Sequence, residues 1–472
     1  MAMTYERIGP KDQWIVDDQG EVTGVRISGK NTEMSGIVTS SRNPLTGGNR
    51  ISRLQAGSQL VPVEMKYKRS TVAIVGDSFA VREAPEAGPN WYGRHTYNGL
   101  FYWTNIMLGA RFECLYVSGE SGSPPWTWLT NGSVDAALVY SPEYLWLTGD
   151  ADGGNTTNTA ADYIAAYTSI FDKAASAGSR IIVHLMPPST ALSTAATRLR
   201  TQQVNAWLKH TAPLNWDVIP LSLAGATLAP GSLTYQAEAT NLTDGTHWQC
   251  PGAFSAATIA ARTLDPLIPK WSPPWVESYD SASGGNTAFI PSPLMIGTGG
   301  GLGTLTSSTG IPAGWTATIT AGESGTANTS ARTDGESGGW LDFAVTFTAT
   351  GKYAEVYIGG ANLCGKVAGD YVEFFAEMKI DPATAARIKA PYFYVEFANA
   401  GIKYATGGDK GSLPSKALGL ASFVGKTASD IYILHIDKTQ IPAGTTAFNV
   451  TVGIASAGAG TCNFSIGRVA IK

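Results

Sequence analysis

Two short segments far apart in the sequence carry residue types that together could cleave an acyl bond. The first is Gly76-Asp77-Ser78-Phe79, which follows an apolar run ending at Val75. A serine at the carboxyl end of a strand, before a helix, points into the crevice where open α/β sheets bind ligands. Because Gly-Asp-Ser is also common turn chemistry, the tripeptide alone leaves a catalytic and a structural interpretation equally open.

The second segment is Asp244-Gly245-Thr246-His247-Trp248, just before the last predicted helix of the same region. A carboxylate three residues before an imidazole can reach the Nδ1–H of the ring and fix the tautomer that presents Nε2 as a base. A serine nucleophile needs such a base, and it also needs donors that stabilise the oxyanion. The spacing is weak evidence alone, because it arises easily by chance. The two segments together are much more specific.

Taken together, the two segments resemble the first and last sequence blocks of the SGNH/GDSL hydrolase family, over residues 69–271. The resemblance implies an esterase in which Ser78 is the nucleophile, His247 is the base and Asp244 orients that base. It also implies an oxyanion hole that uses the backbone N–H groups of Ser78 and Gly119. The implied fold is α/β, a flavodoxin-like three-layer structure around a parallel sheet.

The third block of the family is altered in this chain. Family members usually show Gly-x-Asn-Asp after a strand, and the Asn side chain donates to the oxyanion. Here Gly149 aligns, but Ala151 stands at the Asn position, and a methyl group cannot donate a hydrogen bond. We expect Asn155 to replace it if the loop rearranges, and the alternative is that the two backbone amides act alone. Losing one such donor can cost roughly 10²–10³ in rate.

Several other residues have chemical potential. Phe79, Trp126 and Trp248 could form a stacking wall for a sugar ring, which would make them substrate-binding residues, while ordinary packing is an equally open interpretation. His184 lies within an apolar strand and is expected to be a hydrogen-bonded core residue. The cysteine spacing fits no zinc pattern, and free buried thiols are favoured over the three possible sets of disulfide pairings. We expect neither a metal nor another cofactor.

Alternating periodicities define the elements that must position these residues. Apolar runs typical of buried strands occur at 71–75, 112–117, 144–147, 180–186 and 216–219, with helical spacing between them and at 96–108 and 253–264. Strands that alternate with helices favour a parallel sheet covered on both faces. Asn158 and Thr159 are N-cap candidates for the helix that follows them, and Gly178 is its expected stop.

Composition changes twice along the chain and predicts three domains. Residues 1–68 are polar and turn-rich, with a β-hairpin at 14–25, and are interpreted as an attachment segment. Residues 69–271 form the hydrolase-like domain. After a Pro- and Gly-rich break, residues 288–472 alternate apolar and polar side chains. This pattern predicts an antiparallel, jelly-roll-like β-sandwich that binds carbohydrate or assembles an oligomer.

Charge and hydrophobicity argue against several partners. The formal net charge is -4 and no basic block stands out, so nucleic acid and anionic membranes are poor candidates. No apolar run is long enough to insert into a membrane as a helix. The first residues lack the apolar region of a signal peptide, so we expect no such peptide.

The segments outside the hydrolase-like domain loosely resemble modules of phage tail-fibre and tailspike proteins. This resemblance implies a virion esterase that acts outside the host cell and removes O-acetyl groups from a surface polysaccharide, either capsule or O-antigen. We expect a homo-oligomer such as a trimer. The alternative is a catalytically weak glycan-binding or structural tail module on the same scaffold. Ester turnover and the mass in solution would distinguish these interpretations.

Overall fold

The computed structural model divides the chain into two compact units, Met1–Lys68 and Arg69–Lys472. In the first unit, the backbone of the strands is described. In the second unit, the described residues are 69–83, 86–88, 91–95, 99–149, 157–189, 192, 194–223, 246–248, 250–273, 275, 292–307, 309–361, 363, 365–406 and 431–472.

The first unit contains short antiparallel strands. Its described strands β1 (Thr4–Arg7), β2 (Gln13–Val16), β3 (Val22–Ile27) and β4 (Lys30–Glu33) form one sheet in chain order. In addition, β5 (Ser40–Arg42) pairs with β6 (Asn49–Ile51), and β7 (Leu54–Ala56) pairs with β8 (Gln59–Val61). The predicted hairpin is confirmed, because β2 and β3 pair antiparallel with Trp14 opposite Val25.

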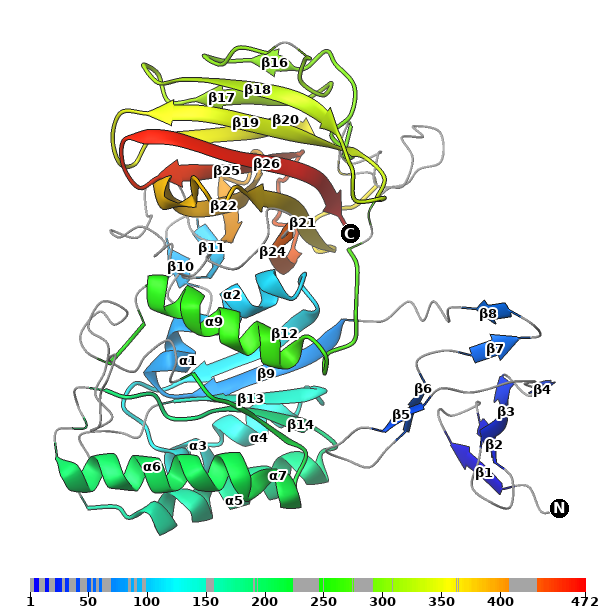
Figure 1. Ribbon diagram of the computed structural model, residues 1–472, viewed down its shortest axis with the longest axis vertical. Coiled ribbons are helices and arrows are strands. Elements are labelled where there is room, and N and C mark those ends of the chain that lie inside the picture. Colours follow the sequence, from blue (N-terminus) through cyan, green and yellow to red (C-terminus); the bar gives the residue numbers. More distant parts are fainter. Residues whose placement is uncertain are drawn as a thin grey trace. The chain divides into compact units, whose positions relative to one another are not determined.

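A parallel sheet lies at the centre of one half of the second unit (Figure 1). Its described strands are β9 (Ser70–Gly76), β12 (Phe112–Gly119), β13 (Tyr144–Thr148), β14 (Arg180–His184) and β15 (Val218–Leu221), in the spatial order β12-β9-β13-β14-β15. Counted along the chain, this is the 2-1-3-4-5 order of flavodoxin-like folds. β9 and β13 are almost wholly buried, which explains their continuous apolar sequences. The predicted parallel sheet is confirmed.

Helices cover both faces of this sheet (Figure 1). After the short α1 (Ser78–Glu83), one face is covered by α2 (Leu100–Met107) and α9 (Cys250–Leu264). On the other face lie α3 (Pro125–Thr130), α4 (Ser133–Leu138), α5 (Ala160–Ser176), α6 (Ala195–His210) and α7 (Ala212–Asn215). As predicted, Thr159 is the N-cap of α5, in a capping box with Asp162, and Gly178 follows its end with a φ of 76°.

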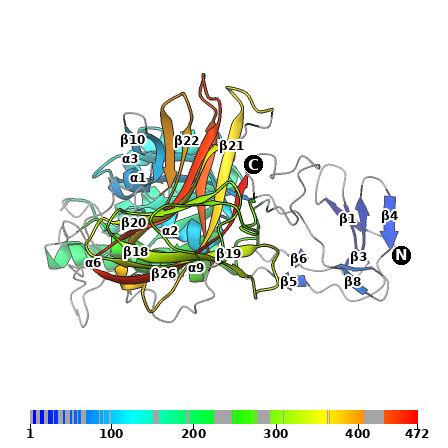
Figure 2. The same ribbon diagram turned by 90° about the horizontal axis from the view of Figure 1, so that it is seen from above.

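The rest of the second unit is a strand-rich region of two sheets, in which β18, β19 and β26 run side by side (Figure 2). The described strands of the first sheet are β10 (Glu86–Gly88), β11 (Trp91–His95), β23 (Ile402–Thr406), β22 (Ile388–Phe397), β25 (Phe448–Ser456), β20 (Tyr353–Ala361), β17 (Thr316–Ile319) and β16 (Gly301–Leu302), in that order. Those of the second are β18 (Ser324–Ala331), β19 (Gly339–Phe347), β26 (Gly460–Ile471), β21 (Tyr371–Ile380) and β24 (Ile431–Gln440). A 3-10 turn, η2 (Ala385–Arg387), precedes β22.

The two sheets of the strand-rich region pack face to face. Phe374 of β21 makes edge contacts with the rings of Phe397 in β22 and Phe448 in β25. Among the described strands of this region, the pairings are antiparallel except for β11 with β23 and β16 with β17. The predicted antiparallel strand-rich region is therefore confirmed.

One hairpin crosses from the parallel-sheet region into the strand-rich region. β10 and β11 belong to the predicted hydrolase-like segment, yet β11 pairs with β23, with Trp91 opposite Lys403. Glu83 links the end of α1 to the start of α2. Its Oε1 accepts hydrogen bonds from the backbone N–H groups of Leu100 (2.6 Å) and Phe101 (3.0 Å). These N–H groups belong to the first turn of α2, where backbone N–H groups have no hydrogen-bond partner within the helix. The buried carboxylate accepts their hydrogen bonds instead.

Buried contacts hold the two regions together as one unit. Arg69 Nη1 lies 2.8 Å from Glu373 Oε1, and the side chains are 2% and 7% exposed. Arg69 Nε also donates to the Ala110 carbonyl oxygen at 2.8 Å. Around this pair, an apolar cluster combines residues of both regions: Ala110, Phe375, Ile433 and Ala470, packed against Trp271 and Trp275. Separating the regions would leave a buried charge without compensation, which is costly.

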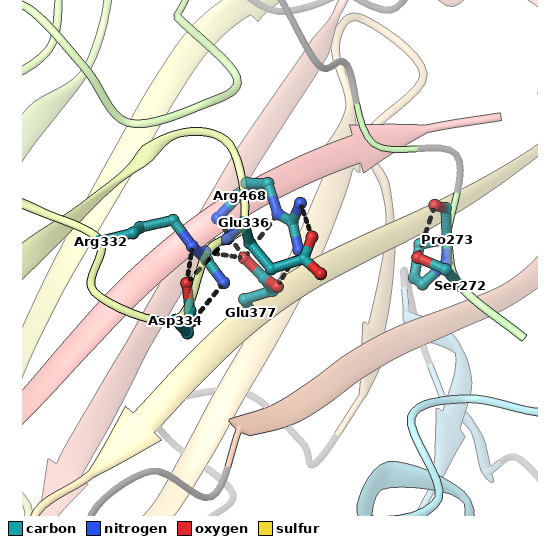
Figure 3. Close-up of polar contacts among 7 residues, drawn as sticks. All are labelled: Ser272, Pro273, Arg332, Asp334, Glu336, Glu377 and Arg468. Atoms are coloured by element: carbon teal, nitrogen blue, oxygen red, sulfur yellow. Dashed lines mark hydrogen bonds and ion pairs between the residues drawn. The ribbon is translucent and has the colours of Figure 1, made fainter. Parts of the chain in front are cut away.

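A second ion cluster lies in the strand-rich region, around Glu377 of β21 (Figure 3). Glu377 of β21 accepts hydrogen bonds from Arg332 Nη1 (2.7 Å) and from Arg468 Nη2 (2.7 Å). Asp334 pairs with Arg332, and Glu336 pairs with Arg468. The side chains of Arg332, Glu377 and Arg468 are 1%, 2% and 6% exposed, respectively. Arg332, Glu377 and Arg468 are thus buried charges with opposite charges as partners, whereas Glu336 at the edge of the cluster is exposed.

Candidate active site

Ser78 lies at the carboxyl end of the parallel sheet, where β9 turns into α1. A Cβ atom added to Gly76 would lie 1.8 Å from the Thr148 carbonyl oxygen, so only glycine lets the ends of β9 and β13 approach this closely. Asp77 is 1% exposed, and its Oδ1 accepts a hydrogen bond from the Phe79 backbone N–H at 2.9 Å. This bond caps α1. The turn therefore fixes the backbone that carries the Ser78 hydroxyl.

His247 meets Ser78 although 169 residues separate them in the chain. Its Nε2 lies 2.6 Å from Ser78 Oγ, which is the distance expected between a nucleophile and its base. For His247 to act as that base, Nε2 must accept the hydroxyl hydrogen bond while Nδ1 carries the ring proton. The ring of Phe79 packs beside the imidazole, with 5.5 Å between centroids. The structure thus brings together the two residues that the sequence pattern selected.

Two predicted site residues lie outside the described residues. Asp244 precedes the described segment 246–248, and Asn155 falls within 150–156 together with Ala151. The orienting role of Asp244 and the oxyanion role of Asn155 therefore stay predictions.

Gly119 is the last residue of β12, which runs two residues beyond its predicted end. It is paired with Gly76, and a Cβ atom added to it would lie 2.4 Å from Val81 N and 2.8 Å from Asp77 O. The end of β12 therefore packs against the first turn of α1, and this contact requires glycine. Its contribution to an oxyanion hole stays a prediction.

The three predicted stacking residues differ in their surroundings. Phe79 and Trp248 are 2% and 1% exposed, and their rings meet edge to face with 5.7 Å between centroids. Trp126 is partly buried and packs against Tyr163 at 5.0 Å. A sugar ring can stack only on an aromatic face that it can reach. Burial therefore favours the packing interpretation for Phe79 and Trp248. Phe79 packs against the His247 ring, and Trp248 is the residue that follows His247 in the sequence.

Two residues that hold the His247 segment were not singled out from the sequence. Ser189 Oγ lies 2.6 Å from Thr246 Oγ1, and Arg82 Nη1 donates to the Trp248 carbonyl oxygen at 3.2 Å. The signal for Arg82 was its spacing, because it lies four residues after Ser78 on the same side of α1. Ser189 follows two prolines beyond β14, and it belongs to no motif.

His184 is a core residue, as predicted. It is 3% exposed, Trp146 Nε1 donates to its Nε2 at 2.7 Å, and Thr148 Oγ1 lies 3.0 Å from its Nδ1. Burial lowers the pKa of the His184 ring from 6.5 to about 3, because the charged form loses its hydration. The imidazole therefore stays neutral at physiological pH.

No group of three or more His, Cys, Asp or Glu residues in the described part of the chain could hold a metal ion. No helix among those described is long and apolar enough to cross a membrane. Cys114 and Cys462 are free thiols, which is the favoured interpretation for these two cysteines.

Comparison with known proteins gives matches to solved structures. No protein-family model and no curated protein matches the chain. One similar structure is a GDSL-like lipase from Bacteroides thetaiotaomicron (12% identity, 42% of this chain and 88% of that chain, TM-score 0.31). Another is a carbohydrate esterase family 3 protein from Talaromyces cellulolyticus (17% identity, 42% of this chain and 98% of that chain, TM-score 0.32).

A third similar structure is the lipase/acylhydrolase from Enterococcus faecalis (14% identity, 43% of this chain and 100% of that chain, TM-score 0.33). All three are described as proteins that act on ester or acyl groups. Because the identities are at most 17% and the TM-scores at most 0.33, the assignment of a function depends on the geometry around Ser78 and His247.

Proposed function

We propose that this chain is a serine esterase, a carboxylic ester hydrolase with Ser78 as nucleophile and His247 as base. The observation that carries the proposal is the 2.6 Å separation between Ser78 Oγ and His247 Nε2 at the carboxyl end of a parallel sheet. Open α/β sheets bind ligands at that end. A hydroxyl that donates to an imidazole is the arrangement of an activated serine.

In the proposed reaction, Ser78 Oγ attacks the carbonyl carbon of the ester while His247 Nε2 takes the hydroxyl proton. The negative charge on the carbonyl oxygen is stabilised by the backbone N–H groups of Ser78 and Gly119 and by the Asn155 side chain. His247 then gives the proton to the departing alcohol, and the acyl group stays on Ser78. Water activated by His247 releases the acid and restores the serine. Asp244 orients the imidazole in each step.

As the substrate, we propose O-acetyl groups on a bacterial surface polysaccharide, either capsule or O-antigen, removed outside the host cell by a phage tail protein. The support is the strand-rich region, which is joined to the parallel-sheet region by buried contacts. A jelly-roll-like connectivity, which recurs in lectin and capsid domains, is part of the same proposal. Such a region would hold the glycan or assemble a homo-oligomer such as a trimer.

Hydrolysis of p-nitrophenyl acetate and butyrate tests the esterase. The wild type is compared with Ser78→Ala and His247→Ala, and Ser133→Ala is the matched control, since Ser133 Oγ bonds Ser118 Oγ at 3.1 Å instead of an imidazole. We expect the wild type and the control to turn over ester. The other two variants should lose roughly 10⁴-fold or more in rate.

Acetate release from acetylated capsule and O-antigen, against the same polymers after chemical deacetylation, tests the substrate class. A mass in solution of three chains would support the trimer. A wild type as inactive as Ser78→Ala on all of these esters would contradict the esterase and favour the glycan-binding or structural tail module.

A further inference from the structure

The segment 246–248 is held on both sides of His247. Before the histidine, Thr246 Oγ1 lies 2.6 Å from Ser189 Oγ. After it, the Trp248 carbonyl oxygen accepts a hydrogen bond from Arg82 Nη1 at 3.2 Å. The two chain neighbours of the imidazole are therefore tied to different elements, one to the loop that follows β14 and the other to α1.

These two anchors come from the elements that build the rest of the candidate site. Arg82 lies four residues after Ser78, so one short helix presents the hydroxyl and also holds the segment of the base. Phe79, in the first turn of that helix, adds ring contacts to His247 and Trp248. Ser189 is 3% exposed and follows two prolines, which restrict the backbone after β14. Both anchors are thus on restrained backbone.

We propose that Arg82 and Ser189 are positioning residues that keep His247 Nε2 within hydrogen-bonding distance of Ser78 Oγ. The inference rests on the proposed function. Arg82 acts through the Trp248 carbonyl and Ser189 acts through the Thr246 hydroxyl. A displacement of about 1 Å between reacting groups can cost about 10²-fold in rate. Loss of either anchor is therefore expected to lower kcat more than it raises KM.

Turnover of p-nitrophenyl acetate by Arg82→Met and Ser189→Ala is the first test. Methionine retains an extended apolar side chain and removes the donors. We expect kcat to fall about 10- to 100-fold with little change in KM. Arg82→Lys keeps a donor at this position and should recover part of the loss. Arg180→Met is the matched control, because Arg180 bonds Asp217 and Tyr144 at the opposite end of the sheet.

The background variant His247→Ala separates positioning from general structural damage. If Arg82 and Ser189 act through the imidazole, their substitution lowers the rate in the wild-type background and leaves the residual rate of His247→Ala unchanged. The same fold-loss in both backgrounds would overturn the proposal, because the two residues would then act on something other than the base.

A second readout does not depend on ester turnover. Labelling the histidine rings with ¹³C gives NMR signals from the five histidines, and His247→Gln identifies the one that belongs to His247. We expect Arg82→Met and Ser189→Ala to shift or broaden that signal and Arg180→Met to leave it unchanged. An unmoved signal in both variants would overturn the positioning role. A responsive signal in a protein that turns over no ester would uphold positioning and reject the esterase.

Discussion

Two regions of the second unit bury polar groups beside a sheet in opposite ways. At the carboxyl end of the parallel sheet, Ser78 and His247 meet as a hydroxyl and an imidazole at a partly buried position. In the strand-rich region, Arg332, Glu377 and Arg468 form ion pairs that are almost completely buried. The first is a hydroxyl–imidazole pair joined by one hydrogen bond, whereas the second is a set of opposite charges joined by ion pairs. Substitutions should therefore change the rate in the first region and the stability in the second.

The largest expected effect is in the candidate site. His247→Ala should lower kcat on p-nitrophenyl acetate by roughly 10⁴–10⁶-fold, because the base and nucleophile act as a unit. The free energy of unfolding, measured in urea, should change by about 1 kcal/mol or less, since the imidazole is only partly buried. A large loss of unfolding free energy in His247→Ala would contradict the expectation that substitutions in the candidate site change the rate and not the stability.

The ion cluster should show the reverse behaviour. Glu377→Gln leaves two buried guanidinium groups facing a neutral amide, which is expected to cost about 3–5 kcal/mol of unfolding free energy. The ester rate per folded molecule should stay unchanged. Glu336→Gln is the matched control, because Glu336 pairs with the same Arg468 but is 58% exposed. Exposed pairs are worth about 0–1 kcal/mol, so equal losses in the two variants would contradict the role of burial.

Gly119→Ala tests the packing between β12 and α1. An added Cβ atom would lie 2.4 Å from Val81 N, so the strand end or the helix must move away. We expect kcat to fall about 10- to 100-fold, since the nucleophile lies on that helix. Gly458→Ala is the control, because a Cβ atom there meets no heavy atom within 4 Å. An unaltered rate in Gly119→Ala would show that this contact is irrelevant to the site.

The smallest expected effect is a pH dependence of stability from His184. The unfolded chain takes up a proton near the ordinary pKa of 6.5, whereas the folded ring does so only near 3. Stability from this group is therefore complete above 6.5 and is lost as the pH falls, by about 1.4 kcal/mol at pH 5.5. Urea unfolding at pH 7.5 and 5.5 should show a smaller difference in His184→Gln. An identical difference would assign the pH dependence to other groups.

The parallel sheet could be predicted because its strands are buried on both faces and appear as continuous apolar runs, as at 71–75 and 144–147. The hairpin of β10 and β11 could not. Its partner is β23, and Trp91 pairs with Lys403 near the other end of the chain. Local periodicity contains no information about so distant a partner. The helical spacing at 96–108, by contrast, corresponds to α2, which begins at Leu100.

The candidate site could be predicted where it is encoded in short motifs. Ser78 and His247 each have a characteristic local spacing. Arg82 binds a backbone carbonyl and Ser189 binds a hydroxyl, which are partners that every segment offers. No motif marks either residue, and only the four-residue spacing of Arg82 from Ser78 indicates its place. The burial of Phe79 depends on which elements pack over it, and that is decided by the tertiary structure.

The pairing of β11 with β23 also sets an order of events during synthesis. Chains leave the ribosome from the amino end, so β11 emerges long before Lys403 exists to pair with Trp91. Until then, the edge of β11 that pairs with β23 has no partner strand. In the sequence, the hairpin of β10 and β11 directly follows α1, the helix that carries Ser78. The sheet that contains β11 can therefore be completed only after residue 403 has been made, in contrast to domains that fold one after another during translation.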